Sequence, residues 1–386
     1  MPNESPPPAP RRSTLPAGLV AVVACICTYG VTAGLTYPLI ALILESRGVD
    51  GSLIGLNAAT PAIATLLFSP FIPRIIARLG LRSFLYACLA LDLALVLALP
   101  AYDSLEAWYV LRAGLGVTGA GLFIASETWI ATIAEPRHRG RVMAVYNAVL
   151  SGSFALSPLI IPLTGIHGWA PFLVGAAFIV LAAVPMALTR APAPPITGAA
   201  SASAYTFAAR APSASLGVLL VAFVYAAASS LLPIYGLRNG LAGDIVPVLL
   251  TATTIGGVAL QFPIGWLADR LDRRVALGVC TALSALGAAL LPLVIDGGPA
   301  LWLLLFVWGG AFSGVYTVAM AIVGDRFAGA DLATAMASFG IMWGMGGLIG
   351  PAIAGAAIET WNPHGFPAVL ALAWLPLLAL ALRRAP

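Results

Sequence analysis

The sequence predicts an all-α membrane protein with twelve transmembrane helices in two pseudo-symmetric six-helix bundles. Three observations carry this prediction: the composition, a series of long apolar segments and an internal repeat. Of the 386 residues, 60% are hydrophobic and only 9% are charged, and the mean hydropathy is +0.98. Because soluble domains carry about 25% charged residues, this composition excludes a soluble globular protein.

Twelve apolar segments are long enough to cross a lipid bilayer. The apolar core of a bilayer is about 30 Å thick and requires about 20 helical residues. Gly and Pro within these segments are common in membrane helices and do not oppose the assignment. The expected spans are residues 17–44, 52–73, 82–101, 106–134, 141–164, 169–188, 215–237, 243–268, 275–295, 300–325, 332–358 and 364–382.

Two Pro-rich stretches mark the expected domain boundaries. Residues 1–16 are polar, and we expect them to form a disordered N-terminal tail. Residues 189–214 are rich in Pro, Ala and Ser with little charge, which is typical of a linker. This cytoplasmic linker would separate an N-terminal bundle over residues 17–188 from a C-terminal bundle over residues 215–382.

The basic residues predict the orientation in the membrane. All 19 are arginine, and if the spans alternate from a cytoplasmic N-terminus, only Arg47 and Arg238 fall in outer segments. This bias follows the positive-inside rule and places both termini in the cytoplasm. The net charge of +4 therefore reports orientation and not a nucleic-acid partner. The predominance of Arg, Ala and Gly is typical of a bacterial source, hence of an inner (plasma) membrane.

The two halves of the chain repeat one another at an offset of 192 to 194 residues. The segment "PFIPRIIARLGLRS" (70–83) falls on "FPIGWLADRLDRRV" (262–275), and Cys88 falls on Cys280. A constant offset between such marks predicts two homologous bundles around a central path, able to rock against each other.

With this repeat, the chain resembles the major facilitator superfamily over nearly its whole length. The segments "GLFIASETW" and "RGRVMAVYN" are most similar to the YcaD-like branch. The resemblance implies transport of a small-molecule substrate by alternating access, by a monomer without a cofactor. Gly346, Gly350, Pro351 and Gly355 in span eleven are similar to a pattern of antiporters, which favours export.

A loop pattern close to G-x-x-x-D-R-x-G-R-R carries a further part of the resemblance. The first copy is degraded, because Ala77 stands where the Asp is usual. The resemblance implies that these residues tie the cytoplasmic helix ends together. The matching residues are Arg78, Gly80 and Arg82 in the first copy, and Gly265, Asp269, Arg270, Arg273 and Arg274 in the second.

Asp92, Arg112 and Glu127 are the ionisable residues within the spans. Each costs about 2.5–3.5 kcal/mol at a helix centre, so each is a functional candidate. Spans three and four should be antiparallel neighbours, which places Asp92 and Arg112 about 6 Å apart in depth. We therefore expect an Asp92–Arg112 pair. It could couple transport to protons, or it could be a static ion pair that fixes helix orientation.

Glu127 lies on one helical stripe with Arg112, Gly116, Gly119 and Phe123. In the family that the chain resembles, span four lines the central cavity, so this stripe is expected to line the path. Glu127 would then lie near the cytoplasmic mouth, within reach of the Arg137–Arg141 cluster or of another helix end. It is interpreted either as part of a gate or capping ion pair, or as a protonation or substrate site.

Other polar and aromatic side chains are candidates for substrate contact. Ordinary helix packing is the alternative for each of them. Spans seven and ten have no ionisable residue in their cores, so the C-terminal half is expected to present an apolar, aromatic wall. Such a wall favours a lipophilic or amphiphilic substrate. The candidates are Tyr29, Tyr37, Asn57, Asn147, Tyr225, Gln261 and Tyr316.

The sequence thus predicts a secondary transporter, with proton-coupled export of small amphiphilic compounds as the first hypothesis. Import or facilitated passage of a small metabolite is the alternative. A membrane-embedded enzyme or scaffold is disfavoured, because no nucleophile–base pair or metal-ligand spacing occurs. A nucleotide-driven pump is disfavoured by the lack of a G-x-x-x-x-G-K-[ST] loop.

Overall fold

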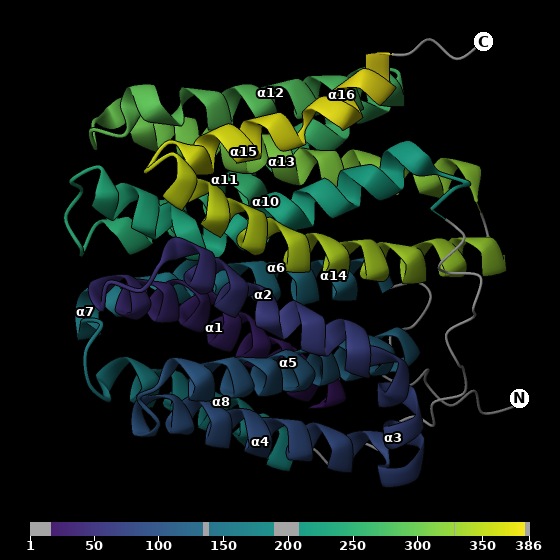
Figure 1. Cartoon of the computed structure of the whole chain (residues 1–386). Coiled ribbons are helices and arrows are strands. Elements are labelled where there is room, and N and C mark those ends of the chain that lie inside the picture. The colour runs from purple at the N-terminus through teal and green to yellow at the C-terminus, as the bar shows by residue number, and fades with distance from the viewer. Residues whose placement is uncertain (1–16, 134–138, 189–207, 328, 383–386) are drawn as a thin grey trace, which may run out of the picture.

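The computed structural model describes residues 17–133, 139–188, 208–327 and 329–382, and every regular element in these ranges is a helix. The predicted tail and most of the predicted linker lie outside the described residues. Figure 1 shows two stacked groups of helices, one from the N-terminal half and one from the C-terminal half. This arrangement confirms the predicted fold class.

In the described residues, the N-terminal bundle comprises eight helices and two short 3₁₀ turns. The turns η1 (Ser69–Phe71) and η2 (Ser157–Leu159) each contain a proline, which lacks the N–H that would continue an α-helix. The helices are α1 (Ala17–Ser46), α2 (Gly51–Phe68), α3 (Ile72–Leu79), α4 (Leu81–Ala101), α5 (Leu105–Ile133), α6 (Arg139–Leu156), α7 (Ile160–Thr164) and α8 (Ala170–Leu188).

The C-terminal bundle consists of seven helices. They are α10 (Pro212–Arg238), α11 (Val246–Arg270), α12 (Arg273–Val294), α13 (Pro299–Arg326), α14 (Gly329–Thr360), α15 (Gly365–Ala373) and α16 (Leu375–Leu382). Each of the twelve predicted spans coincides with one of these helices or with a consecutive set of them.

Eleven helices of the described chain are long and apolar enough to cross a membrane. The twelfth span is shorter, over Gly365–Ala381, and it is interrupted at Trp374 between α15 and α16. Pro376 explains the interruption, because it cannot donate to the carbonyl four residues earlier and its ring crowds that turn. The second span is longer than predicted, since α3 continues it to Leu79.

The two bundles repeat the same close helix crossings. A Cβ atom added to Gly116 of α5 would lie 2.3 Å from the Pro61 carbonyl oxygen of α2. In the other bundle, a Cβ atom added to Gly309 of α13 would lie 1.9 Å from the Thr253 carbonyl oxygen of α11. Gly116 and Gly309 are 193 residues apart, so the repeat in the sequence is also a repeat of backbone contacts.

A second pair of contacts follows the same offset. Gly121 of α5 lies against Cys88 of α4, and Gly314 of α13 lies against Cys280 of α12. In both bundles a glycine makes room for the thiol of a neighbouring helix. Cys88 and Cys280 therefore occupy equivalent packing positions, and all four cysteines are free thiols.

The described ends of the chain lie on one face of the molecule. α1 begins and α16 ends at this face, which we call the termini face, and the opposite face is called the distal face (Figure 1). The bundles meet chiefly where α2 packs on α14, with further contacts between α1 and α10 and between α6 and α11.

The contact between α2 and α14 is tightest in its distal part. Added Cβ atoms at Gly55 and Gly355 would lie 2.2 and 2.3 Å from the carbonyl oxygens of Pro351 and Gly51, so the two backbones touch. Small residues permit this approach, as at many interfaces of membrane helices. The glycines of the antiporter-like pattern therefore serve helix packing in this structure.

Candidate functional site

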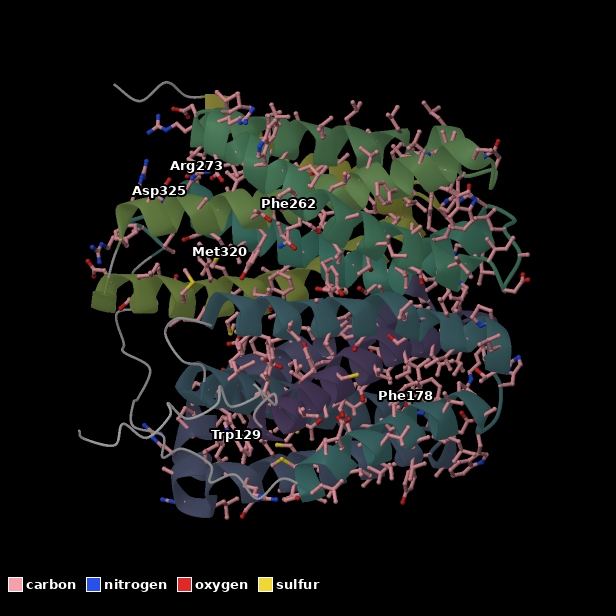
Figure 2. All side chains as sticks on the ribbon, turned by 180° about the vertical axis from the view of Figure 1, so that it is seen from behind. Trp129, Phe178, Phe262, Arg273, Met320 and Asp325 are labelled. Carbon is pink, nitrogen blue, oxygen red and sulfur yellow. The ribbon has the colours of Figure 1, made fainter. Side chains whose placement is uncertain are left out.

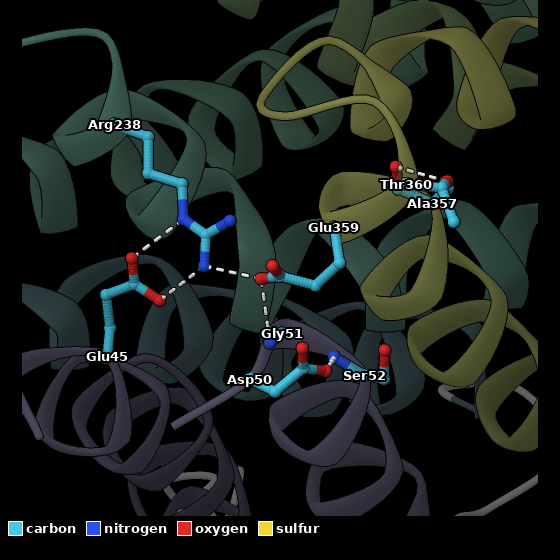
Figure 3. A network of polar contacts seen from close by, with 8 residues as sticks. All are labelled: Glu45, Asp50, Gly51, Ser52, Arg238, Ala357, Glu359 and Thr360. Atoms are coloured by element: carbon cyan, nitrogen blue, oxygen red, sulfur yellow. Dashed lines mark hydrogen bonds and ion pairs between the residues drawn. The ribbon is translucent and has the colours of Figure 1, made fainter. Parts of the chain in front are cut away.

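An ion-pair network joins the two bundles at the distal face, and we call Glu45, Gly51, Arg238 and Glu359 the distal latch (Figure 3). Arg238 of α10 donates to both oxygens of Glu45 of α1, at 2.7 and 2.9 Å. It also donates to Glu359 of α14 at 2.7 Å. Glu359 in turn accepts from the Gly51 backbone N–H of α2 at 2.8 Å.

The geometry of the distal latch favours a strong contact. The guanidinium group holds Glu45 through two parallel bonds, which is the most directional arrangement available to an arginine–carboxylate pair. The three side chains are only 15–26% exposed, so solvent screens them weakly. Beside the latch, Asp50 caps α2 by accepting from Ser52, and this hydrogen bond lowers the pKa of Asp50.

Asp92 lies buried in α4, and two threonines contact its carboxylate. Thr32 of α1 donates to one oxygen at 2.9 Å, and Thr118 of α5 donates to the other at 2.6 Å. Asp92 is 1% exposed. The three residues form a polar cluster between three helices of the N-terminal bundle.

Arg112 lies buried in α5 and contacts α1. Its guanidinium donates to Thr36 at 3.4 Å and lies over the Tyr37 ring, 4.2 Å from the centroid. Its Nε atom has no hydrogen-bond partner among the described residues. The ring compensates part of the charge, because a cation over an aromatic face is electrostatically favourable.

The predicted ion pair between Asp92 and Arg112 is therefore wrong for this structure. The two residues contact different partners, and no ion pair joins them within the described ranges. Hydroxyl groups of α1 and α5 satisfy Asp92 at closer range. The rotation of α4 and α5 about their own axes decides which side chains meet, and equal depth alone does not.

Glu127 of α5 is half-buried and forms no ion pair with any described residue. It lies in electrostatic range of Tyr146 of α6 and of Tyr316 of α13, in the opposite bundle. The Tyr146 hydroxyl is buried without a hydrogen-bond partner in the described chain. The predicted neighbours, the Arg137–Arg141 cluster, lie outside the residues whose side chains are described.

Six aromatic rings form a continuous series across the two bundles, and we call it the aromatic ladder. Neighbouring ring centroids are 5.6–6.1 Å apart. These separations are typical of favourable aromatic pairs. In order, the rings are Phe123, Tyr29 and Phe154 of the N-terminal bundle, then Tyr225, Trp343 and Tyr316 of the C-terminal bundle.

Three of the predicted cavity residues, Tyr29, Tyr225 and Tyr316, belong to the aromatic ladder, whereas Tyr37 lies under Arg112. Phe154 and Trp343 were not predicted. Trp343 lies in a Gly-rich stretch of span eleven, where the antiporter-like pattern includes only Gly and Pro residues.

The other predicted cavity residues lie apart from the ladder contacts. Asn57 of α2 is buried at 1% exposure, and its side-chain nitrogen has no partner within the described chain. Asn147 of α6 and Gln261 of α11 are exposed. Substrate contact stays a prediction for these three residues.

The stripe on α5 is only partly accessible. Gly116 packs on α2 and Gly119 packs on Tyr29, so these two positions belong to helix packing. Phe123 and Glu127 keep accessible surface. The accessible part of the stripe is therefore its end near the termini face.

The second copy of the loop pattern organises the termini face of the C-terminal bundle. Arg273 donates to Asp269 at 2.9 Å and to Asp325 of α13 at 3.0 Å. Figure 2 shows Arg273 and Asp325 together at this end of the bundle. Arg270 lies over the Trp266 ring, 3.8 Å from its centroid. Gly265 lies one turn before Asp269 in α11, and Arg274 is the second residue of α12, where its backbone N–H donates to Asp272 at 2.7 Å.

The first copy acts within the N-terminal bundle. Arg82 donates to the Met186 carbonyl at 2.9 Å, Gly80 adopts a φ of 80° between α3 and α4, and Arg78 is exposed. Among the described residues, neither copy contacts the opposite bundle. The expected tie between cytoplasmic helix ends stays a prediction.

A family model for the Major Facilitator Superfamily matches residues 22–243 and 214–386. Over 92% of its length, the chain is 24% identical to the MFS-type transporter YfkF of Bacillus subtilis (strain 168), of which 94% is covered. It is 23% identical to the MFS-type transporter YcaD of Salmonella paratyphi B, over 86% of both chains.

Solved structures with the same fold include two transporters. The crystal structure of the nucleoside transporter NupG aligns with a TM-score of 0.75 at 14% identity, over 95% of this chain and 96% of that chain. A bacterial homologue of the human lysosomal transporter Spinster, in an inward-facing and unoccupied conformation, aligns with a TM-score of 0.73 at 16% identity. That alignment covers 96% of this chain and 94% of that chain.

Proposed function

Because this chain belongs to the Major Facilitator Superfamily, and is thus a multi-pass membrane transporter of small molecules, we propose that it exports amphiphilic compounds in exchange for protons. The observation that carries the proposal is Glu127. It is a partly accessible carboxylate in the membrane, without an ion-pair partner in the described chain, and tyrosines of both bundles lie within its electrostatic range.

The charge balance inside the membrane supports proton binding. Between the helix ends, the N-terminal bundle carries Asp92, Arg112 and Glu127, whose formal charges sum to −1 when all are ionised. A net charge at this depth is costly, and one bound proton would remove it. Glu127 is the accessible group of the three, whereas Asp92 and Arg112 are each 1% exposed.

The Asp92 cluster is suited to hold a proton in addition. The Thr118 hydroxyl lies 2.6 Å from Asp92 and 3.2 Å from the Leu115 carbonyl oxygen, and it has one proton to donate. When that proton points to Leu115, the short contact with Asp92 requires a proton on the carboxyl group. The hydrogen bonds of the cluster can therefore accommodate Asp92 both as a carboxylate and as a carboxylic acid.

Alternating access is supported by the contrast between the two faces. At the distal face, the latch joins the bundles, whereas the contacts of both loop-pattern copies remain within their own bundles. The arginine bias favours a cytoplasmic termini face, and the bacterial relatives favour an inner membrane. In this orientation, the described conformation is closed toward the outside.

The aromatic ladder supports an amphiphilic substrate. Its rings present apolar surface from both bundles, and its tyrosines add hydroxyl groups. Aromatic residues commonly line sites that take such ligands. We propose export as the direction of transport and a monomer as the working unit.

The test is proton flux in proteoliposomes that contain the purified protein and an internal pH dye. A panel of amphiphilic compounds is added to vesicles with an imposed pH gradient, and compound-dependent proton movement is recorded. We expect Glu127→Gln to abolish this movement and Asp92→Asn to reduce it strongly. Glu106→Gln, an exposed carboxylate at the start of the same helix α5, is the matched control. Unchanged flux in both Glu127→Gln and Asp92→Asn would remove the proposed coupling.

A further inference from the structure

The aromatic ladder lies near the middle of the membrane spans that form it, yet it keeps accessible surface. Tyr29, Phe154, Tyr225 and Tyr316 are all partly accessible, and Trp343 is 40% exposed. In a monomeric membrane protein, an accessible tryptophan that contacts rings of two other helices is available to a ligand. The ladder therefore offers a surface of aromatic faces and edges at the junction of the bundles.

Aromatic faces select ligands by charge as well as by apolar area. The negative face of a ring attracts a cation, and the effect grows when water is excluded. The N-terminal bundle already contains a contact between a cation and a ring face, because the Arg112 guanidinium lies 4.2 Å from the Tyr37 centroid. A planar apolar group would also gain from contact with the faces and edges of the ladder.

The charges around the ladder favour a positive ligand. Arg112 is 1% exposed and engaged by Thr36 and Tyr37, and Asp92 is 1% exposed and engaged by Thr32 and Thr118. Outside their first and last turns, the ladder helices α10, α13 and α14 carry no Asp, Glu, Lys, Arg or His. Among the residues whose side chains the structure describes, Glu127 is thus the accessible charge near the ladder, one helical turn beyond Phe123.

We infer that the aromatic ladder and Glu127 form a binding site for an organic cation that carries a planar aromatic ring. The rings would take the planar group, and the carboxylate would neutralise the cationic centre. This inference rests on the proposed function, because it names the class of substrate that the transporter would take. Binding, however, can be measured without transport.

The experiment compares two probes of nearly the same shape. N-methylacridinium is a permanent cation, and acridine is neutral at mildly alkaline pH. Binding of each to the purified full chain in lipid nanodiscs is measured by calorimetry. We expect the wild type to bind the cation about tenfold more tightly than acridine, the order that desolvated cation–ring and charge contacts supply.

Variants at two positions assign the preference to the named residues. Glu127→Gln should reduce the affinity for N-methylacridinium to that for acridine and leave the affinity for acridine nearly unchanged. Trp343→Ala should weaken both probes, and Trp343→Phe should restore most of the binding. The matched controls are Glu106→Gln and Trp169→Ala, an exposed carboxylate and a 48% exposed tryptophan away from the ladder. Neither should change the binding of either probe.

The outcomes also separate this inference from the proposed function. Equal affinity for both probes in the wild type, a cation preference that survives Glu127→Gln, or unchanged binding in Trp343→Ala would overturn the cation site. If neutral amphiphiles evoke Glu127-dependent proton flux while no cation preference exists, proton-coupled transport stands and the cation site fails. If the cation preference depends on Glu127 but no compound moves protons, the cation site stands and the coupling fails.

Discussion

At matched positions, the N-terminal bundle carries ionisable side chains where the C-terminal bundle carries none. With the offsets of 192 and 193 residues that relate the helix crossings, Asp92 corresponds to Ser284, Arg112 to Leu305 and Glu127 to Met320. Ser284 and Leu305 are fully buried, like their charged counterparts. Figure 2 shows Met320 inside the C-terminal bundle.

This difference separates the helix contacts that the fold requires from the charged residues that it does not require. The C-terminal bundle makes the same close crossings at Gly309 and Gly314 without a charge between its helix ends. Each buried charge of the N-terminal bundle therefore adds a cost of about 2.5–3.5 kcal/mol that the frame does not need. Groups that are costly and dispensable for folding are the strongest candidates for function.

The largest expected effect is a loss of stability at the close helix crossings that the two bundles share. Gly116→Val and Gly309→Val each push a side chain into the backbone of a neighbouring helix, so each should lower the free energy of unfolding by more than about 4 kcal/mol, the range of the most severe single substitutions. The measurement is unfolding in detergent mixtures. Gly152→Val is the control, because a Cβ atom there meets nothing within 4 Å. A severe loss in one bundle only would break the equivalence of the two crossings.

A smaller effect is expected when the matched buried residues are exchanged. In the C-terminal bundle, the apolar Ala311 stands at the position that corresponds to Thr118, which donates to Asp92. Ser284→Asp would therefore lack this donor and should lower the free energy of unfolding by about 2.5–3.5 kcal/mol. Asp92→Ser removes two interhelical hydrogen bonds, which average about 0.6 kcal/mol each in membranes. Unfolding free energies of both variants test this order. Equal losses would show that the C-terminal bundle can also accommodate a carboxylate.

The smallest effect concerns the distal latch, where the C-terminal bundle supplies the positive charge. Arg238→Met should weaken the closed distal face by about 1–3 kcal/mol, the range for hydrogen bonds to charged groups. Spin labels at Glu106→Cys and Asp244→Cys would report a longer distance between the bundles. Arg47→Met is the matched control, since Arg47 pairs with Asp103 inside one bundle. Identical distance distributions in all three proteins would mean that the latch does not hold the face closed.

Most of the fold could be predicted from the sequence, because bilayer thickness fixes helix length and apolar runs show where helices lie. The ends of α1, α4 and α8 differ from the predicted ends by two residues or fewer. The break at Trp374 and the extension through α3 were missed. Both depend on how a proline is accommodated locally, which hydropathy does not report.

The candidate site could be predicted only in part. Position in a span gives the depth of a residue, but its direction toward a neighbour depends on the rotation of both helices. For this reason the sequence placed Asp92 near Arg112, whereas Thr32 and Thr118 contact Asp92. The distal latch had a usable signal, because Arg238 was one of two arginines expected outside.

The backbone contact of α14 with α2 at Gly355 has a mechanical consequence. Gly355 lies five residues from the distal end of α14 and 26 residues from its other end, a lever arm of roughly 39 Å. With this glycine contact as the fulcrum, a tilt of about 10° would displace the termini-face end by about 7 Å and the distal end by only about 1 Å. A tilt about this contact would therefore widen one mouth considerably while the other hardly moved.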